Sequence, residues 1–382
     1  MLIKKSFQLS FLLLIGISFL FLSTGWVTLR SNSVIKNNDQ KSKKEKTTDE
    51  VFKNIKVLKG MPASQLMPTM HFFEASLGFD CSNCHVRGHM DSDKKPEKRK
   101  ARKMIKMMEA INKDNFEGKQ IVTCFTCHRG NPNPQIIPTV MTAALMKERR
   151  EEAKTAEEEI SVPNRLNTPE EIIAKYQQAI GGKSAYEKLT SLKFEGTVDN
   201  GNNRTLRISI VQKAPSYFYS SLTFPFGEMA KGYNGSEGWV KSPRGVQQLR
   251  AGDEQDIKLA ADFYAPLNIL KDYSALKFSD VKLLNGDTVY VVDARYSNIR
   301  RFRFYFDVYS GLLLRKIQYD KTLLGELQTR TDYSDYRNVN GVLFPFRMLV
   351  ADYENNTDIK FSNVAANTEV NTNIFNMPPK TN

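Results

Sequence analysis

Residues 81–85 read CSNCH and residues 124–128 read CFTCH. Both strings have the pattern C-x-x-C-H, in which two thiols three residues apart add to the vinyl groups of one haem and the following histidine binds the iron. A thioredoxin-like dithiol or half of a zinc site would use the cysteines but would not explain a histidine directly after each pair. The strings therefore predict two covalently bound haem c groups. The expected attachment cysteines and iron-binding histidines are Cys81, Cys84, Cys124, Cys127, His85 and His128.

The sixth iron ligand is expected from methionines upstream of each string. Residues 64–77 (SQLMPTMHFFEASL) and 100–112 (KARKMIKMMEAIN) each read as a helix preceding a haem string. A thioether ligand raises the reduction potential of haem iron, whereas a vacant position allows small-molecule binding or peroxide chemistry. In each helix the methionines share a face, so spacing leaves the choice open. The candidates are Met67 and Met70 in the first helix, and Met104, Met107 and Met108 in the second.

Residues 51–138 resemble the tetrahaem cytochrome subunit of bacterial photosynthetic reaction centres. The resemblance is carried by Leu66–Cys81 and by Ala101–Gly130, each of which reads as a helix, a turn and C-x-x-C-H. It implies that Met70 and Met104 are the sixth ligands, because most haems of that family take a methionine from the preceding helix. Only two repeats are present where the family has four, so we expect the haem-binding unit without the photosynthetic role.

The N-terminal residues 1–30 read as a targeting segment. Lys4 and Lys5 precede an almost wholly apolar stretch, residues 7–29. Its length of about 23 residues suffices to cross a hydrocarbon layer of ~30 Å and exceeds the usual signal-peptide core. An uncleaved membrane anchor is therefore favoured over a cleaved signal. Either reading exports the body of the chain, to the periplasmic side of the inner membrane or to the periplasm.

Beyond residue 168 the sequence changes to the period-two pattern of β-strands. A helix over residues 169–180 is expected first, with Thr168 as its N-cap and Gly181-Gly182 as its stop. Strands follow, separated by turn signals such as Asn285-Gly286 and Asn340-Gly341. A run of antiparallel hairpins after a helix predicts an α+β domain with a strongly curved antiparallel sheet.

This C-terminal pattern resembles the half-barrels of periplasmic lipoprotein carriers and outer-membrane lipoprotein-sorting proteins. The string from Tyr333 to Phe346 (YSDYRNVNGVLFPF) carries the resemblance. It implies a concave face that holds a lipid or another hydrophobic ligand; the alternative is that the aromatic residues are plain sheet core. The region lacks Cys and His and contains no nucleophile elbow or phosphate-binding loop, so catalysis is not expected there.

The expected organisation is multidomain. In chain order we predict a signal or membrane anchor (1–30), a polar linker (31–50), a small α-helical dihaem cytochrome c domain (51–138), a charged helical connector (139–167) and the antiparallel half-barrel domain (168–382).

The net charge of +13 does not require nucleic acid as a partner. Residues 94–106 carry eight Lys or Arg against one Glu, which suits either a solvated helix surface or an acidic redox partner. The leading interpretation is an electron carrier, not an enzyme, that serves a redox protein or a membrane electron-transfer complex. The alternatives are a dihaem peroxidase, and a hydrophobic-ligand binding protein with redox-sensing haems.

Overall fold

The computed structural model describes residues 45–379 apart from 135, 137–145, 148–159, 161, 200–204, 226, 244 and 250. It divides into two compact units. The helical unit comprises residues 27–165 together with Tyr319–Gln328, and the sheet unit comprises Leu166–Gln318 with Thr329–Asn382. The predicted membrane segment lies outside the described residues, and so does most of the predicted connector. No helix among the described residues is both long and apolar enough to cross a membrane.

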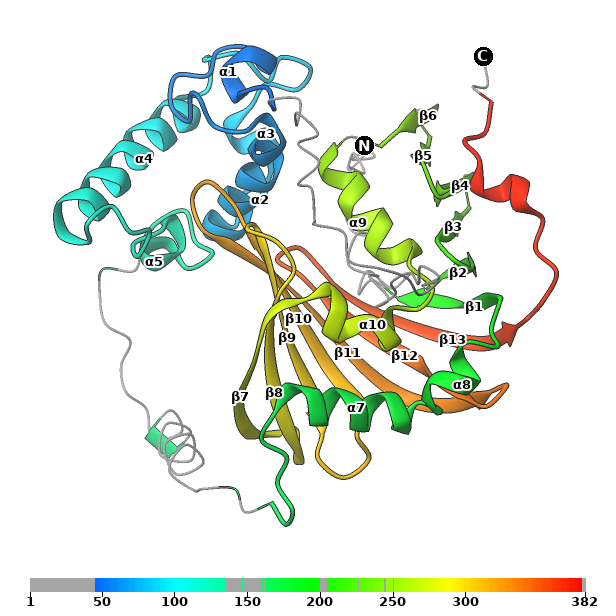
Figure 1. Ribbon diagram of the computed structural model, residues 1–382. Helices are drawn as coiled ribbons and strands as arrows, with labels where there is room; N and C mark the ends of the chain where they lie inside the picture. The colour runs from blue at the N-terminus through cyan, green and yellow to red at the C-terminus, as the bar shows by residue number, and fades with distance from the viewer. Residues whose placement is uncertain are drawn as a thin grey trace, which may run out of the picture. The chain divides into compact units, whose positions relative to one another are not determined.

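The helical unit is built from helices joined by loops, and α4 is the longest of its described helices (Figure 1). Its helices in chain order are α1 (Thr48–Val51), η2 (Ala63–Gln65), α2 (Leu66–Leu77), α3 (Cys81–Cys84), α4 (Pro96–Asn115) and α5 (Cys124–His128). The helices expected before each haem string are confirmed as α2 and α4. Helix α4 begins earlier than expected because Pro96 occupies its first turn, where a missing N–H costs nothing.

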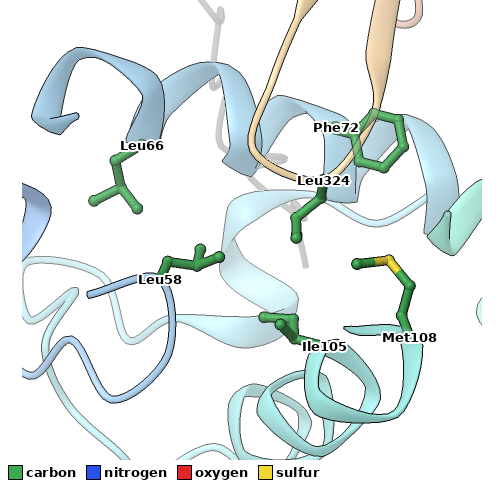
Figure 2. Close-up of a cluster of buried hydrophobic side chains, with 6 residues drawn as sticks. All are labelled: Leu58, Leu66, Phe72, Ile105, Met108 and Leu324. Carbon is green, nitrogen blue, oxygen red and sulfur yellow. The ribbon is translucent and has the colours of Figure 1, made fainter. Parts of the chain in front are cut away.

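The core of the helical unit is small. Figure 2 shows its six buried side chains, which come from three separate stretches of the chain. They are Leu58, Leu66, Phe72, Ile105, Met108 and Leu324. In α2 and α4 the buried positions recur every three or four residues, as an amphipathic helix requires.

The sheet unit contains a sheet of 13 strands among the described residues, in the order β6-β5-β4-β3-β2-β1-β13-β12-β11-β10-β9-β8-β7. The strands are β1 (Ser191–Asp199), β2 (Thr205–Lys213), β3 (Tyr217–Phe224), β4 (Gly227–Tyr233), β5 (Gly238–Ser242), β6 (Gly245–Gln248), β7 (Ser274–Leu284), β8 (Asp287–Arg295), β9 (Arg300–Asp307), β10 (Leu313–Lys321), β11 (Glu326–Val339), β12 (Val342–Ala351) and β13 (Asn356–Ala366). The described strand pairs are antiparallel, and β1 joins the two halves by pairing with both β2 and β13.

The sheet curves strongly, and helices pack on it (Figure 1). A register shift between Glu195 and Gly196 marks a bulge in β1, and only glycine fits there because a Cβ would lie 2.0 Å from the Lys360 carbonyl oxygen. The helices are α7 (Pro169–Ala179), α8 (Gly182–Tyr186), α9 (Ala251–Ala261), α10 (Ala265–Asp272) and the 3-10 turn η3 (Thr372–Phe375). Tyr176 of α7 packs against Phe306 of β9, with 5.2 Å between ring centroids.

The expected curved antiparallel sheet is thereby confirmed, together with the helix that precedes it. Helix α7 starts after Thr168, whose hydroxyl accepts a hydrogen bond from the Glu171 N–H while the Glu171 carboxylate returns to Thr168. This capping box satisfies N–H groups that the first turn of a helix leaves without partners.

Candidate haem-binding site

Each C-x-x-C string forms a single helical turn that is capped at its N-terminus. In α3 the Asp80 carboxylate accepts the N–H of Ser82 at 2.7 Å. In α5 the hydroxyl of Thr126 accepts the N–H of Thr123 at 3.0 Å. One turn places residues three apart on the same side of the helix, so each turn presents two thiols and the start of the following histidine to one neighbourhood.

Both histidines are oriented by a backbone carbonyl. The Nδ1 atom of His85 lies 2.7 Å from the Met90 carbonyl oxygen, and Nδ1 of His128 lies 3.0 Å from that of Asn131. A carbonyl oxygen only accepts hydrogen bonds, so each Nδ1 carries a proton, which leaves Nε2 as the ring nitrogen available to bind a metal. Metal-binding histidines are commonly held in this way, with the second nitrogen fixed by a carbonyl or carboxylate. The same arrangement at both strings fits an iron ligand at each Nε2.

The cysteines do not have the character of a redox dithiol. All four are free thiols in the structure, and Cys81 donates to the Glu74 carboxylate, with 2.9 Å between Sγ and Oε1. Burial, reinforced by Glu74, raises the pKa of the Cys81 thiol to about 12, and burial raises the pKa of Cys124 to about 11. Reactive dithiols require a lowered pKa, so the raised pKa values of Cys81 and Cys124 do not support a thioredoxin-like dithiol.

The candidate sixth ligands differ in exposure. Met70 is half-buried on α2, whereas Met67 is 42% exposed. On α4, Met104 and Met107 are 41% and 48% exposed, while Met108 is 5% exposed and belongs to the core cluster. Met108 thus lies in the core cluster, Met70 packs against that cluster while half-buried, and Met104 and Met107 lie on the surface of α4.

Large apolar side chains lie exposed around the two strings. Besides the exposed methionines, Phe125 within the second string is 51% exposed and Ile121 just before it is 57% exposed. Exposed apolar patches on a soluble domain mark binding surfaces, and a porphyrin is a flat apolar partner of suitable chemistry. Among the described residues no group of three or more His, Cys, Asp or Glu is arranged to hold a metal ion. The residues present thus fit haem c.

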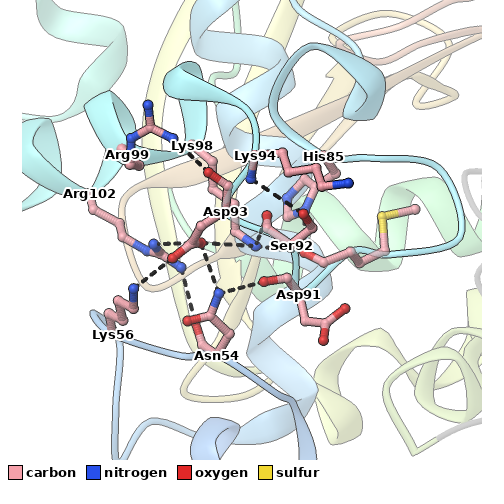
Figure 3. A network of polar contacts seen from close by, with 11 residues as sticks. Asn54, Lys56, His85, Asp91, Ser92, Asp93, Lys94, Lys98, Arg99 and Arg102 are labelled. Atoms are coloured by element: carbon pink, nitrogen blue, oxygen red, sulfur yellow. Dashed lines mark hydrogen bonds and ion pairs between the residues drawn. The ribbon is translucent and has the colours of Figure 1, made fainter.

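A polar network fixes the loop that carries the His85 carbonyl partner (Figure 3). Asp93 accepts hydrogen bonds from Lys56 Nζ at 2.6 Å, from Asn54 Nδ2 at 2.8 Å and from Arg102 Nη1 at 2.9 Å. Lys98 Nζ donates to the Met90 carbonyl at 2.7 Å, the same oxygen that contacts His85.

The Lys56 hydrogen bond, with Arg102 and Asn54, holds the pKa of the Asp93 carboxyl well below its ordinary value. Burial lowers the pKa of His85, which favours the neutral, metal-binding imidazole.

The second string has its own anchor in a buried amide. Asn112, at 5% exposure on α4, accepts the N–H groups of Ile121 and Val122 at 3.1 and 2.8 Å and donates to the Val122 carbonyl at 2.7 Å. Every polar atom of this side chain is thereby used to fasten the loop ahead of Cys124.

The two strings meet at the C-terminal end of α2. Gly130, two residues after His128, donates its N–H to the Ser76 carbonyl at 2.9 Å. Gly78 ends α2 with φ +63°, and a Cβ there would lie 2.4 Å from the Gly130 carbonyl oxygen. Only glycine permits both the left-handed conformation and this approach. One helix end therefore positions residues on both sides of the candidate site.

Sequence analysis did not foresee two parts of this site. One is the Asp93 network, which joins residues up to 48 positions apart. The other is the tip of the β10–β11 hairpin, Tyr319–Gln328, which belongs to the helical unit and contributes Leu324 to its core. The dipeptide Leu323-Leu324 at a turn was a usable signal, since exposed turns rarely carry two leucines.

The sheet unit has a cavity of about 40 Å³ lined mainly by aromatic and aliphatic side chains. Its lining residues include Tyr176, Tyr186, Tyr333, Tyr336 and Phe344. This volume suits one or a few water molecules, whereas pockets for small organic ligands measure ~300 Å³ or more. The cavity is too small for an acyl chain.

The comparisons with known proteins agree with the haem strings. Residues 23–178 match the family described as photosynthetic reaction centre cytochrome C subunit. The chain is 37% identical over 90 residues to the subunit of Thermochromatium tepidum, covering 22% of each protein. It is 33% identical over 87 residues to cytochrome c-554 of Chloroflexus aurantiacus, covering 21% of each. The chain thus matches about a fifth of the length of these relatives, and the predicted resemblance to the cytochrome subunit family is confirmed.

The structure is also similar to solved structures over about half of the chain. A LolA superfamily protein from Nitrosomonas europaea aligns with a TM-score of 0.40 and 15% identity, covering 55% of this chain and 98% of that one. A putative outer membrane lipoprotein-sorting protein domain from Vibrio parahaemolyticus aligns with a TM-score of 0.39 and 14% identity, covering 54% and 97%.

Proposed function

We propose that this chain is a dihaem c-type cytochrome that transfers electrons. The observation that best supports this proposal is the same geometry at both strings. In each, the histidine Nδ1–H donates to a backbone carbonyl, and Nε2 is available to bind iron. The match to the reaction-centre cytochrome subunit family supports the same reading. Bound haem iron would supply a one-electron Fe(III)/Fe(II) couple.

Each predicted site residue has one role in this proposal. Cys81 and Cys84 would bind the first haem covalently, as Cys124 and Cys127 would bind the second. His85 and His128 would be the proximal ligands. Met70 and Met104 would be the sixth ligands, which favours electron transfer over peroxide chemistry because neither iron would keep an open position.

The partner proposed is a redox protein or membrane electron-transfer complex with an acidic docking face. Helix α4 carries five exposed cationic side chains, which are Arg99, Lys100, Lys103, Lys106 and Lys113. Such a field speeds the encounter with an acidic surface and fixes its orientation. We further propose that residues 1–30 anchor the chain to the inner membrane, with both units on the periplasmic side. Residues 31–50 and 139–167 would serve as linker and connector, flanking a cytochrome domain over 51–138.

The sheet unit is proposed as a docking module and not as a lipid carrier. The cavity lined by Tyr176, Tyr186 and Phe344, of about 40 Å³, does not itself accommodate an acyl chain. Organic extraction of the purified full chain followed by mass spectrometry checks it, since stoichiometric co-purifying lipid would overturn the docking assignment.

The proposed function is tested on the full chain expressed with a haem-attachment system. Mass spectrometry should show the mass of two haems added to the polypeptide. Absorption spectra of both oxidation states should show low-spin haem with a Met–iron charge-transfer band. A high-spin haem that binds carbon monoxide readily, or turnover of peroxide, would favour the peroxidase alternative instead.

A further inference from the structure

The tip of the β10–β11 hairpin is an integral part of the helical unit. Leu324 is 1% exposed and lies among Leu66 and Phe72 of α2 and Ile105 and Met108 of α4 (Figure 2). Leucine at such a position bridges the two helices that carry the candidate sixth ligands. Removing it would leave a cavity between them.

The tip also makes polar contacts that lead toward both strings. The N–H of Leu323 donates to the Thr69 hydroxyl at 3.2 Å, and the Leu323 carbonyl accepts from Gln120 Nε2 at 2.9 Å. Thr69 is fully buried and directly precedes Met70. Gln120 lies four residues before Cys124. The backbone of Leu323 therefore contacts Thr69, which is next to the candidate ligand Met70, and Gln120, which lies close to the second haem string.

The shape of the tip is fixed internally. The Thr322 hydroxyl accepts the N–H groups of Leu324 and Gly325 at 3.2 and 3.1 Å and donates to the Gly325 carbonyl at 2.9 Å. A Cβ at Gly325 would lie 2.2 Å from the Phe72 ring, so the turn fits against α2 without room for a side chain. Because its own hydrogen bonds already fix this turn, it loses little conformational freedom when it packs against α2.

We propose that Tyr319–Gln328 is a positioning element for haem ligation, with Leu324 as its principal residue. The inference rests on the proposed function, because it assumes that Met70 and Met104 bind iron. The tip holds α2 against α4 and against the loop before Cys124, and so keeps the methionines within reach of their irons. The residue acts through the two helices and touches neither iron, which distinguishes it from a ligand.

The test compares Leu324→Ala with Leu283→Ala in the haem-loaded full chain. Leu283 is 54% exposed on β7, so it controls for loss of a leucine as such. The readouts are the Met–iron band of the oxidised protein and the rate of carbon monoxide binding to the reduced protein. We expect Leu324→Ala to weaken the band and raise the binding rate about tenfold. Leu324→Met should restore both, since it refills the volume.

Gln120→Ala tests the same element without entering the core, because Gln120 is exposed. It should change the spectrum in the same direction and less, even if Leu324→Ala does not fold. The positioning role is overturned if the melting temperature falls in Leu324→Ala while the band and the binding rate match the control, or if Gln120→Ala is silent when Leu324→Ala cannot be purified. A parent protein that already binds carbon monoxide would instead contradict the Met/His proposal itself.

Discussion

The two units obtain their stability from different sources. The sheet unit buries large aromatic side chains completely, including Phe194, Phe304 and Phe306. The helical unit buries six apolar residues in its core and leaves methionines and Phe125 exposed around the haem strings. Apolar burial is the main favourable contribution to folding, and the sheet unit obtains it from its own side chains. On the proposed function, bound haem would cover the exposed apolar side chains of the helical unit.

The largest expected effect follows from removing one haem attachment. Cys81→Ala combined with Cys84→Ala should abolish one covalent haem and about half of the haem absorbance. The helical unit should then lose its sharp thermal transition while the sheet unit keeps its own, because only the former depends on bound cofactor. Calorimetry and mass spectrometry check both parts. Equal destabilisation of both units would contradict the contrast drawn above.

The sheet core gives the converse prediction. Phe304→Ala should lower the free energy of unfolding of the sheet unit by about 3–5 kcal/mol, because Phe304 is fully buried between aromatic neighbours. Tyr309→Ala, at a 70% exposed position, should change it by less than about 0.5 kcal/mol. Haem content and the haem spectrum should be unchanged in both variants. Denaturant titration followed by aromatic circular dichroism measures the difference.

Much of this contrast was predictable from sequence, and the reasons are local. Alternation such as Phe302, Phe304 and Phe306 predicts a strand with one buried face, and the structure has that strand as β9. The haem strings are recognisable because their chemistry requires fixed spacing. Neither signal depends on distant residues.

The parts that were missed depend on contacts between distant residues. Leu324 and Phe72 are separated by some 250 positions, and Asp93 meets Asn54 and Lys56 across nearly 40. Periodicity carries no information about such pairs. Spacing likewise leaves the choice among Met104, Met107 and Met108 open, whereas their exposures of 41%, 48% and 5% become visible only in three dimensions.

A buried cation sharpens the contrast through pH. Lys316 on β10 is 3% exposed, and burial together with the neighbouring Arg300 lowers its pKa to about 7 from the ordinary 10.5. Below pH 7 Lys316 is charged in the folded state, where its Nζ lies 5.8 Å from the centroid of the Phe302 ring. Between pH 7 and 10.5 the unfolded chain binds more protons, so this group makes stability rise with pH. Lys316→Met should remove that rise. Chemical denaturation at several pH values checks this, with Lys360→Met as the exposed control.

The smallest effect on the haem spectra is expected from substitution of Asp93. This carboxylate stabilises its part of the helical unit through ion pairs and hydrogen bonds and not through apolar burial. The pKa of Asp93 is lowered, so its contribution is present above the ordinary value of 3.8 and is lost as pH falls through the folded value. Asp93→Asn should therefore make the Met90 carbonyl and the His85 ring more mobile. The size of this effect should be the same at every pH from 5 to 8, and the difference between variant and parent should shrink below pH 4. NMR spectroscopy of the hyperfine-shifted haem methyl resonances of the oxidised protein measures this at the first haem, with the second haem as internal reference. Asp335→Asn, which disrupts an exposed pair with Arg337 in the sheet unit, should leave both haem spectra unchanged. An equal change at both haems would show that the network acts on the whole unit and not on the His85 loop.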